Sequence, residues 1–147
     1  MNSILIVYAT AGGNTEVVCE KIQAFFQEKN IQSTLLRCEF VKSDTIAQAQ
    51  TLIFACPTYG HGELEKNFER FLFSLRDIDL KNKKLGIIAL GDPKYDQDYC
   101  LESANILLHF VQKHGGNLVN PPLKIVKSPF SFFPFISKWA EEFVSKM

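Results

Sequence analysis

Short and almost purely apolar runs recur along the chain. The strongest are residues 4–9 ("ILIVYA"), 51–57 ("TLIFACP") and 85–90 ("LGIIAL"). Such runs, without alternating polar positions, are typical of strands that are buried on both faces of a parallel sheet. A weaker, more polar strand is predicted at residues 31–38. A fifth is predicted at residues 117–126, where Pro121 and Pro122 indicate a position at the sheet edge.

Apolar residues at helical spacing fill the intervals between these strands. The predicted helices cover residues 17–29, 64–75, 103–116 and 133–147, with an optional further helix between the second and third strands. The clearest apolar stripes are Val18, Ile22, Phe25 and Phe26 in the first helix and Leu64, Phe68, Phe71, Leu72 and Leu75 in the second. Gly115 and Gly116 end the third helix, and Pro134 is tolerated in the first turn of the fourth. Because strands and helices alternate without a linker or repeat, the pattern predicts one α/β domain over residues 1–147, with helices on both faces of a five-stranded parallel sheet.

The composition is that of an ordinary globular protein. Apolar residues make up 46% and charged residues 22% of the 147 residues, which is enough for a sizeable core. Sixteen basic residues balance sixteen acidic ones, and this balance argues against a nonspecific nucleic-acid binder. The first residues lack the basic region of a secretion signal, and no apolar run approaches the length of a membrane span. Without CxxC spacing, reduced and mostly buried thiols in a cytoplasmic protein are expected for Cys19, Cys38, Cys56 and Cys100.

The loop after the first strand carries the first chemical signal. Residues 10–15, "TAGGNT", place two glycines and several side-chain donors at the point where a helix begins. A helix N-terminus offers unpaired N–H groups and the positive end of the helix dipole, and glycines let the backbone wrap closely around a ligand. The loop therefore suits a terminal phosphate. The alternative is a glycine-rich loop whose Thr or Asn merely caps the helix.

Three other anion-binding motifs do not match this loop. It lacks the GxxxxGK[ST] sequence of P-loop nucleotidases. It also lacks GxGxxG, and no acidic residue stands convincingly at the end of the second strand, which argues against a dinucleotide site. A phospho-receiver domain requires acidic residues at the end of the first strand, whereas this strand ends in Tyr8, Ala9 and Thr10.

Two further loops follow the third and fourth predicted strands. The first contains Tyr59 beside Gly60, and the second contains Gly91 and Tyr95. Ligands of open parallel sheets bind beyond the carboxyl ends of the strands, at the topological switch point. Two tyrosines on neighbouring loops at this edge would form the walls of a slot for a flat ring. For either loop alone, an ordinary turn with a partly buried tyrosine is the alternative.

Taken together, these motifs resemble those of short-chain flavodoxins over essentially the whole chain. The matching segments are "TAGGNTE" (10–16), "PTYGHGEL" (57–64) and "LGDPKY" (90–95). Their order and spacing on this pattern of elements make the resemblance specific. It implies a three-layer flavodoxin-like sandwich with strand order 2-1-3-4-5, flavin mononucleotide (FMN) as the cofactor, and the carriage of one or two electrons as the function.

The resemblance also implies roles for individual residues. Those that would hold the phosphate are Thr10, Ala11, Gly12, Gly13, Asn14 and Thr15. Pro57 and Thr58 would line the ribityl chain. Tyr59 and Tyr95 would flank the isoalloxazine ring, with Tyr95 as the coplanar outer partner. The residues whose backbone would meet the pyrimidine edge of the ring are Leu90, Gly91 and Asp92.

For the redox chemistry, the resemblance implies that the protein tunes the potentials of the flavin and catalyses no reaction of its own. Gly60 can flip its peptide at little cost, and its carbonyl would then accept a hydrogen bond from N5–H of the neutral semiquinone. Stacking on tyrosine and the nearby Asp92 carboxylate would disfavour added electron density on the ring. The expected protein is a low-potential carrier working between the semiquinone and the hydroquinone.

Several positions depart from the family pattern. Ala11 and Gly12 stand where many flavodoxins have hydroxyl side chains, so fewer side chains can donate to the phosphate. His61 follows Gly60, where a small or acidic residue is common, and its titration near neutral pH either couples to the flavin or leaves it unaffected. Many flavodoxins are acidic, whereas this chain is neutral. Either a local acidic rim for a basic partner or ordinary solvated charge is expected from Glu63, Glu65, Asp92, Asp96, Asp98 and Glu102.

The segment "KSPFSFFPFISKW" (127–139) is rich in aromatic residues. One helical face, predicted to lie mostly in the core, contains Phe132, Ile136, Trp139, Ala140 and Phe143. Phe130, Phe133 and Phe135 fall off this stripe. A partner surface and a membrane contact are both open interpretations of these three residues.

Two other functions compete with the electron carrier. A small FMN-dependent reductase acting on a quinone or similar acceptor would need a nicotinamide site, and none is visible in this short chain. A dedicated flavodoxin-like activator of another enzyme, for instance a ribonucleotide reductase, would form a tight complex with that enzyme. For the carrier we expect a cytoplasmic monomer that binds neither nucleic acid nor membranes. Its expected partners are redox proteins, a reductase as donor and a low-potential enzyme as acceptor.

Overall fold

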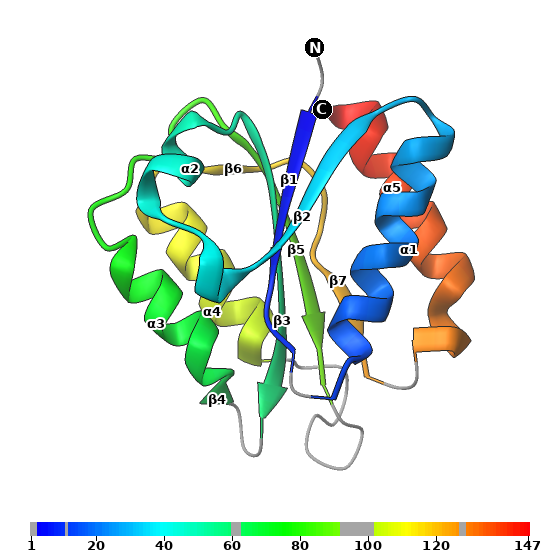
Figure 1. The fold of residues 1–147 in the computed structure, drawn as a ribbon, viewed down its shortest axis with the longest axis horizontal. Helices are drawn as coiled ribbons and strands as arrows, with labels where there is room; N and C mark the ends of the chain where they lie inside the picture. Colours follow the sequence, from blue (N-terminus) through cyan, green and yellow to red (C-terminus); the bar gives the residue numbers. More distant parts are fainter. Residues whose placement is uncertain (1–2, 11, 60–62, 92–101, 127–128) are drawn as a thin grey trace.

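The structure, a computed structural model, describes residues 3–10, 12–59, 63–91, 102–126 and 129–147. Its strands are β1 (Ser3–Tyr8), β2 (Gln32–Arg37), β3 (Thr51–Tyr59), β4 (Glu63–Leu64), β5 (Lys84–Leu90), β6 (Asn117–Leu118) and β7 (Leu123–Ile125). Its α-helices are α1 (Asn14–Glu28), α2 (Ser43–Gln48), α3 (Lys66–Ser74), α4 (Glu102–Lys113) and α5 (Phe133–Lys146), and its 3-10 helices are η1 (Cys38–Phe40) and η3 (Pro129–Phe132). A central sheet stands between two layers of helices, as the alternating sequence pattern predicts (Figure 1).

The sheet has the predicted strand order. Its parallel path runs β2-β1-β3-β5-β6, and β7 pairs with β5 further along the same edge. β6 and β7 are two pieces of the fifth predicted strand, residues 117–126. Pro121 and Pro122 lie between the pieces, because a proline has no N–H to donate to the ladder. The predicted edge position is confirmed, since within the described ranges both pieces pair only with β5.

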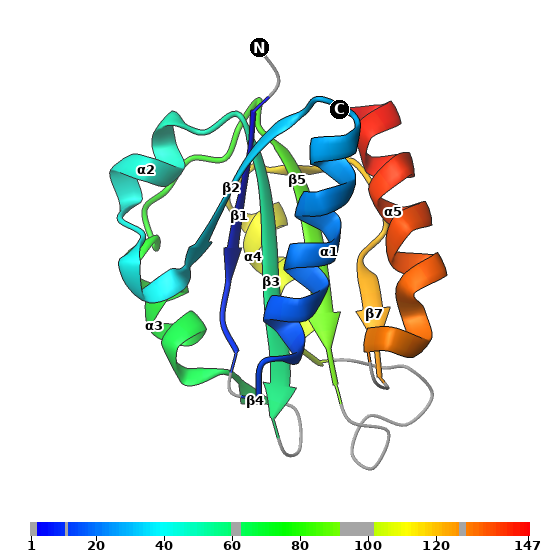
Figure 2. The ribbon, with the colours of Figure 1, turned by 45° about the vertical axis from the view of Figure 1, so that its right-hand side comes forward.

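Side chains of the central strands alternate between two apolar cores. In β1, Leu5 and Val7 face the core under α3 and α4, whereas Ile4 and Ile6 face the core under α1 and α5. Figure 2 shows these two helical layers on opposite sides of the sheet. The central strands are therefore covered on both faces, which is why their sequences lack polar alternation.

Gly86 in β5 lets α5 approach the sheet closely. A Cβ at this position would lie 2.7 Å from Phe143 Cε2 and 2.9 Å from Trp139 Cη2. The two aromatic rings stack with their centroids 5.2 Å apart. Trp139 Nε1 also donates a hydrogen bond to the carbonyl of Pro121 at 2.7 Å. α5 is thus fixed both on the sheet and on the segment that separates β6 from β7.

The aromatic segment divides much as its helical stripe predicts. Its buried residues are Ile136, Trp139, Ala140 and Phe143. Phe132 is half-buried rather than fully buried. Phe130 and Phe135 are 67% and 61% exposed, and their rings pack on those of Phe133 and Phe132. The structure thus assigns the stripe to the core and leaves two phenylalanines at the surface.

Helix boundaries differ from the predicted ones by two or more residues at three places. α1 begins at Asn14, three residues before the predicted start at residue 17, because the polar turn that precedes the apolar stripe is already helical. α3 begins at Lys66, since Leu64 pairs instead with Thr58 between β4 and β3. α4 ends at Lys113, and Gly115 follows with a φ of +81°.

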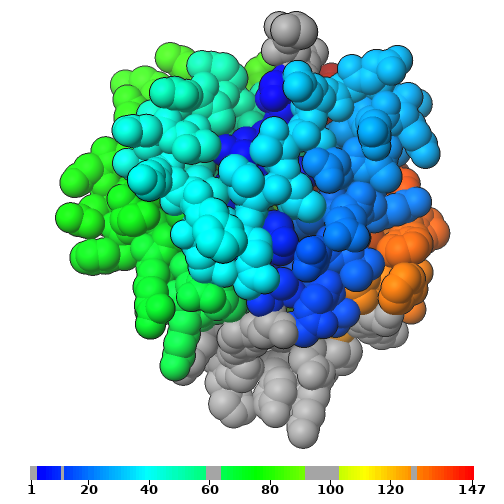
Figure 3. All heavy atoms as spheres, viewed as in Figure 1, coloured from blue at the N-terminus to red at the C-terminus, as the bar shows by residue number. Residues whose placement is uncertain are grey.

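Three short elements, β4, η1 and η3, have no counterpart among the predicted ones. Each spans no more than four residues, too few for hydrophobic periodicity to appear. The optional helix between the second and third strands is present as α2. In the space-filling view, the segment from β2 to α2 (cyan) lies across the middle of the face shown (Figure 3).

Candidate functional site

The carboxyl ends of β1, β3 and β5 meet the N-terminus of α1 at one edge of the molecule, at the lower end of Figures 1 and 2. β1 leads to α1 on one face of the sheet, whereas β3 leads to α3 on the other face. Two neighbouring strands whose connections diverge in this way define the switch point at which open parallel sheets bind ligands. We refer to this end of the sheet as the carboxyl edge.

The loop between β1 and α1 is shaped around an open space. The Gly13 N–H donates to Thr10 Oγ1 at 2.8 Å, so the threonine side chain closes the turn from within. Gly13 is the N-cap of α1, with a φ of +88°, a conformation that favours glycine. A Cβ added at Gly12 or Gly13 would meet none of the described residues within 4 Å. The backbone is therefore accessible to a ligand here, and the N-cap carries no side chain that competes for the first N–H groups of the helix.

The side chains of the first turn complete a set of donors. Asn14 is exposed, whereas Thr15 is only 1% exposed. Among the described residues the Thr15 hydroxyl has no hydrogen-bond partner, and a buried hydroxyl is costly unless something pairs with it. Free helical N–H groups and hydroxyl donors suit the terminal phosphate of a nucleotide and do not require a lysine. This set of donors thus fits the phosphate of FMN. The Thr10 hydroxyl oxygen accepts from the Gly13 N–H and so fixes the conformation of the loop.

Tyr8 is the last residue of β1, immediately before this loop, and it is 5% exposed. Burial raises the pKa of its phenol, and the Glu16 carboxylate in the first turn of α1 raises it further. Arg37, paired with Tyr8 in the parallel register of β1 and β2, opposes this shift. The phenol is therefore neutral at physiological pH and adds no charge beneath the phosphate loop.

The ends of β3 and β5 run side by side at the same edge, with Pro57 opposite Leu90. The Gly91 N–H donates to the carbonyl of Ile125 at 2.8 Å, so this N–H is used within the fold. The Thr58 side chain is 6% exposed and bonds to Ser103 at the start of α4. The structure thus places Pro57, Thr58, Leu90 and Gly91 at the carboxyl edge, and their contacts with FMN stay predictions.

Ser103 is the residue that sequence reasoning missed. It lies 45 residues from Thr58, and a serine in the first turn of a helix is an ordinary feature of any sequence. Only the tertiary structure brings it to the carboxyl edge.

Part of the predicted site, including most of the ring-binding residues, lies outside the described residues. This applies to Ala11, Gly60, His61, Asp92 and Tyr95, and to the side chain of Tyr59. The aromatic slot and the Gly60 peptide therefore stay predictions.

The prediction of an acidic rim at the surface is wrong for one of its residues, Glu65. Glu65 is 6% exposed, and its carboxylate accepts hydrogen bonds from the N–H groups of Asn67 at 2.9 Å and Phe68 at 3.0 Å. It is the N-cap of α3, where a carboxylate satisfies the free N–H groups of the first turn. A buried capping carboxylate is unavailable to a partner protein.

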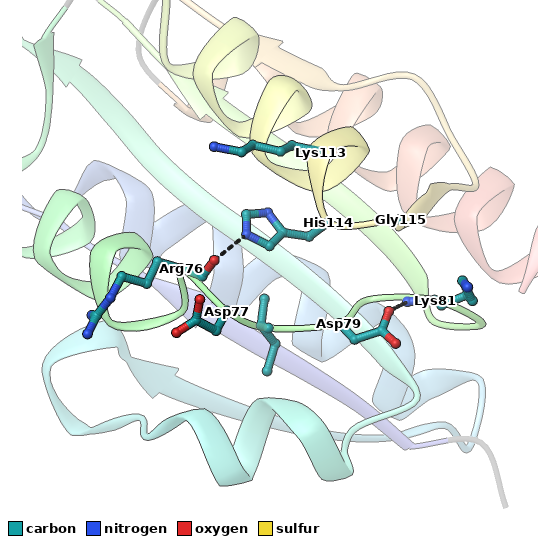
Figure 4. A pocket seen from close by; sticks show the side chains of 8 residues that line it. Arg76, Asp77, Asp79, Lys81, Lys113, His114 and Gly115 are labelled. Carbon is teal, nitrogen blue, oxygen red and sulfur yellow. Dashed lines mark hydrogen bonds between the residues drawn. The ribbon is translucent and has the colours of Figure 1, made fainter.

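A second concave region lies at the opposite edge of the sheet. This open hollow of about 420 Å³ is formed by the α3–β5 connection and the end of α4 (Figure 4). His114 Nε2 lies 3.0 Å from the carbonyl oxygen of Arg76, and Nδ1 lies 2.8 Å from that of Phe110. Since both ring nitrogens already contact backbone carbonyls, the histidine ties α4 to the end of α3. The hollow mixes the acidic side chains of Asp77 and Asp79 with basic side chains.

Two other features are absent from the part of the chain that the structure describes. There, no group of three or more His, Cys, Asp and Glu side chains is placed to hold a metal ion. Nor does any helix of that part have the length and apolar character needed to cross a membrane.

The fold and the site define a doubly wound α/β protein in which free N–H and hydroxyl donors gather at the switch point. The sequence profile of the flavodoxin family matches residues 6–129. The flavodoxin of Maridesulfovibrio salexigens is 30% identical over 132 residues, which cover 88% of this chain and 89% of that protein. The chain therefore belongs to the flavodoxin family.

Solved structures agree with this assignment. The crystal structure of oxidised flavodoxin 2 from Bacillus cereus matches with a TM-score of 0.91 and 29% identity, covering 99% of each chain. A structure of Fusobacterium nucleatum flavodoxin bound to flavin mononucleotide matches in fold with a TM-score of 0.85 at 22% identity, covering 100% of this chain and 99% of that one. The resemblance to short-chain flavodoxins and the predicted fold class are confirmed.

Proposed function

We propose that this member of the flavodoxin family binds FMN at the carboxyl edge and carries electrons at low potential between redox partner proteins. The observation that supports this most directly is the loop between β1 and α1. It combines an open backbone at Gly12 and Gly13 with a buried Thr15 hydroxyl that lacks a partner among the described residues. When bound, FMN supplies one- and two-electron redox chemistry.

The residues of the chain bind and orient the cofactor. The first N–H groups of α1 and the side chains of Asn14 and Thr15 hold the phosphate, while Thr10 fixes the turn around it. By the motif match, Tyr59 and Tyr95 cover the two faces of the ring and exclude water from it. By the same match, the Gly60 carbonyl oxygen would accept a hydrogen bond from a ring N–H, and this bond would tune the potential.

The carrier catalyses no reaction alone, takes electrons from a reductase and passes them to a low-potential enzyme. We propose that it works as a cytoplasmic monomer. The three described cysteines, Cys19, Cys38 and Cys56, support the cytoplasmic location because they are buried and unpaired.

The phosphate site is tested by titrating the apoprotein with FMN and with riboflavin, which lacks the phosphate, and following the quenching of flavin fluorescence. Thr15→Val should weaken FMN binding about tenfold or more, since a hydrogen bond to a charged group is lost, and should leave riboflavin binding unchanged. Thr51→Val is the matched control, because Thr51 is also buried but starts β3 at the opposite edge of the sheet. Equal losses for FMN and riboflavin would contradict a phosphate at this loop.

The carrier function is tested by an anaerobic reductive titration of the FMN-loaded protein followed by visible absorption. We expect a one-electron-reduced flavin to accumulate, since a carrier that passes single electrons must stabilise that state. Direct reduction to the two-electron level, together with oxidation of a nicotinamide cofactor by the isolated protein, would support a reductase instead.

A further inference from the structure

Two buried hydroxyl groups meet at the carboxyl edge. Thr58 on β3 is 6% exposed, and Ser103 on α4 is fully buried at 0%. Thr58 Oγ1 donates to Ser103 Oγ at 2.6 Å, and the Ser103 N–H donates back to Thr58 Oγ1 at 3.1 Å. The second bond satisfies an N–H group of the first turn of α4, which has no acceptor within the helix. Each hydroxyl thus compensates the burial of the other.

The pair joins two segments that border the proposed ring site. Thr58 directly precedes Tyr59, and it pairs with Leu64 in the antiparallel register of β3 and β4. The Thr58–Ser103 bonds therefore hold the base of the β3–β4 hairpin against α4. On the other side, Ser103 is the second residue of α4, and α4 follows the segment of the chain that contains the predicted ring partner Tyr95.

Apolar packing holds the start of α4 independently of the hydroxyl pair. Ala104 is 2% exposed and packs in a small cluster with Ala89 of β5 and Val126. Leu107 and the rest of the buried face of α4 belong to the larger core under α3 and α4. Loss of the hydroxyl pair should therefore leave the protein folded and allow only β3 and α4 to shift relative to one another.

We propose that Ser103 is a positioning residue of the flavin site. Its hydroxyl and N–H fix the Thr58 side chain, and through it the carboxyl end of β3 and the backbone of Tyr59, the residue predicted to flank the ring. The Thr58 hydroxyl points to α4, where it bonds to Ser103. This inference rests on the proposed FMN site and adds a residue that acts on it through β3.

The test compares Ser103→Ala and Thr58→Val with the wild-type protein. Ser103→Ala removes the bond between the hydroxyls, whereas Thr58→Val also removes the acceptor of the Ser103 N–H. Both should weaken binding of FMN and of riboflavin by the same factor, about tenfold, because the disturbance is at the ring and not at the phosphate. Both should also change the separation between the two one-electron midpoint potentials, which a loss of global stability alone would not do.

Two further variants separate positioning from general damage. Thr58→Ser keeps the hydroxyl and should recover most of the affinity that Thr58→Val loses. Ser74→Ala removes a helical hydroxyl that bonds to the Phe71 carbonyl at the far end of α3, and it should leave flavin binding and potentials unchanged.

The outcomes are distinguishable. If the wild-type protein binds neither flavin, the proposed function fails, and this inference fails with it. If the wild-type protein binds FMN while Ser103→Ala binds both flavins with unchanged affinity and potentials, the inference alone is overturned. A variant that loses FMN but keeps riboflavin would also overturn it, because the pair would then act on the phosphate loop.

Discussion

At the scale of single residues, backbone geometry decides how the phosphate loop is built. Gly12 and Gly13 are neighbours, and a Cβ at either would enter open space. Only Gly13 has a positive φ, at +88°, where residues with a Cβ are strained. The sequence does not distinguish the two glycines, but only the position of Gly13 requires a backbone conformation that favours glycine.

Gly13→Ala should lower the free energy of unfolding of the apoprotein by about 1–2 kcal/mol, because alanine is strained in the left-handed conformation. Gly12→Ala should change it by less than about 0.5 kcal/mol, since it adds a methyl group to open space without strain. Urea unfolding of the two apoproteins measures the difference. Equal losses in both variants would show that the effect is not conformational strain at the N-cap of α1.

At the scale of elements, short helices depend on partners that are distant in the sequence. α2 has only six residues, too few to be stable by itself. Lys83, just before β5, is 6% exposed and its Nζ donates to the carbonyls of Ala47 at 2.7 Å and Ala49 at 2.5 Å. Burial lowers the pKa of this ammonium group, while Asp79 opposes the shift. A cation at the C-terminal end of α2 thus anchors the helix to the sheet.

Lys83→Met keeps the length of the side chain and removes both donors. We expect the free energy of unfolding to fall by about 1–3 kcal/mol, the range for hydrogen bonds from a charged group. Lys84→Met is the control, because its side chain is exposed at the next position. Hydrogen exchange of α2 amides should rise in Lys83→Met alone. Matched stability losses in the two variants would argue against a specific anchor.

At the scale of the whole molecule, both faces of the sheet bury ionisable thiols. The buried cysteines are Cys19, Cys38 and Cys56. Burial raises the pKa of each thiol, and for Cys38 a hydrogen bond to the Glu39 carboxylate at 3.1 Å adds to the effect. In the unfolded chain the same thiols titrate near their ordinary pKa of about 8.5. The folded state consequently keeps protons that the unfolded state loses.

This linkage predicts alkaline destabilisation. A group whose pKa is raised by folding stabilises the folded state below its unfolded pKa, and this contribution is lost as the pH rises above it. As the pH rises from 8 to 9.5, each buried thiol should lower the free energy of unfolding by about 1 kcal/mol.

Urea unfolding in the presence of a reductant, in a Cys100→Ser background, measures this slope. Adding Cys19→Ala should remove about one third of it, because one of the three thiols is gone. An unchanged slope would mean that these thiols do not titrate differently in the two states.

The sequence determined the class of fold because its signals are local. The three apolar runs require burial on both faces, and the helical stripe from Phe68 to Leu75 requires a sheet to cover it, so the alternating parallel sandwich follows. Pro121 and Pro122 fixed the broken strand at the edge, since proline cannot donate to a ladder. The phosphate loop was also visible, because its glycines and hydroxyls are contiguous.

Only the tertiary structure decided which polar groups pair across the sheet. Glu65 could be read from the sequence as a surface charge, but its carboxylate caps α3 in the core. No local feature of the sequence marks Ser103 as the partner of Thr58. The sequence likewise does not show that the Gly91 N–H donates to the Ile125 carbonyl of β7. Apolar periodicity is set by neighbours one turn or one strand position away, whereas a buried polar contact depends on segments brought together by folding. That is why the family could be predicted from the residues alone, while the pairing of Thr58 with Ser103 could not.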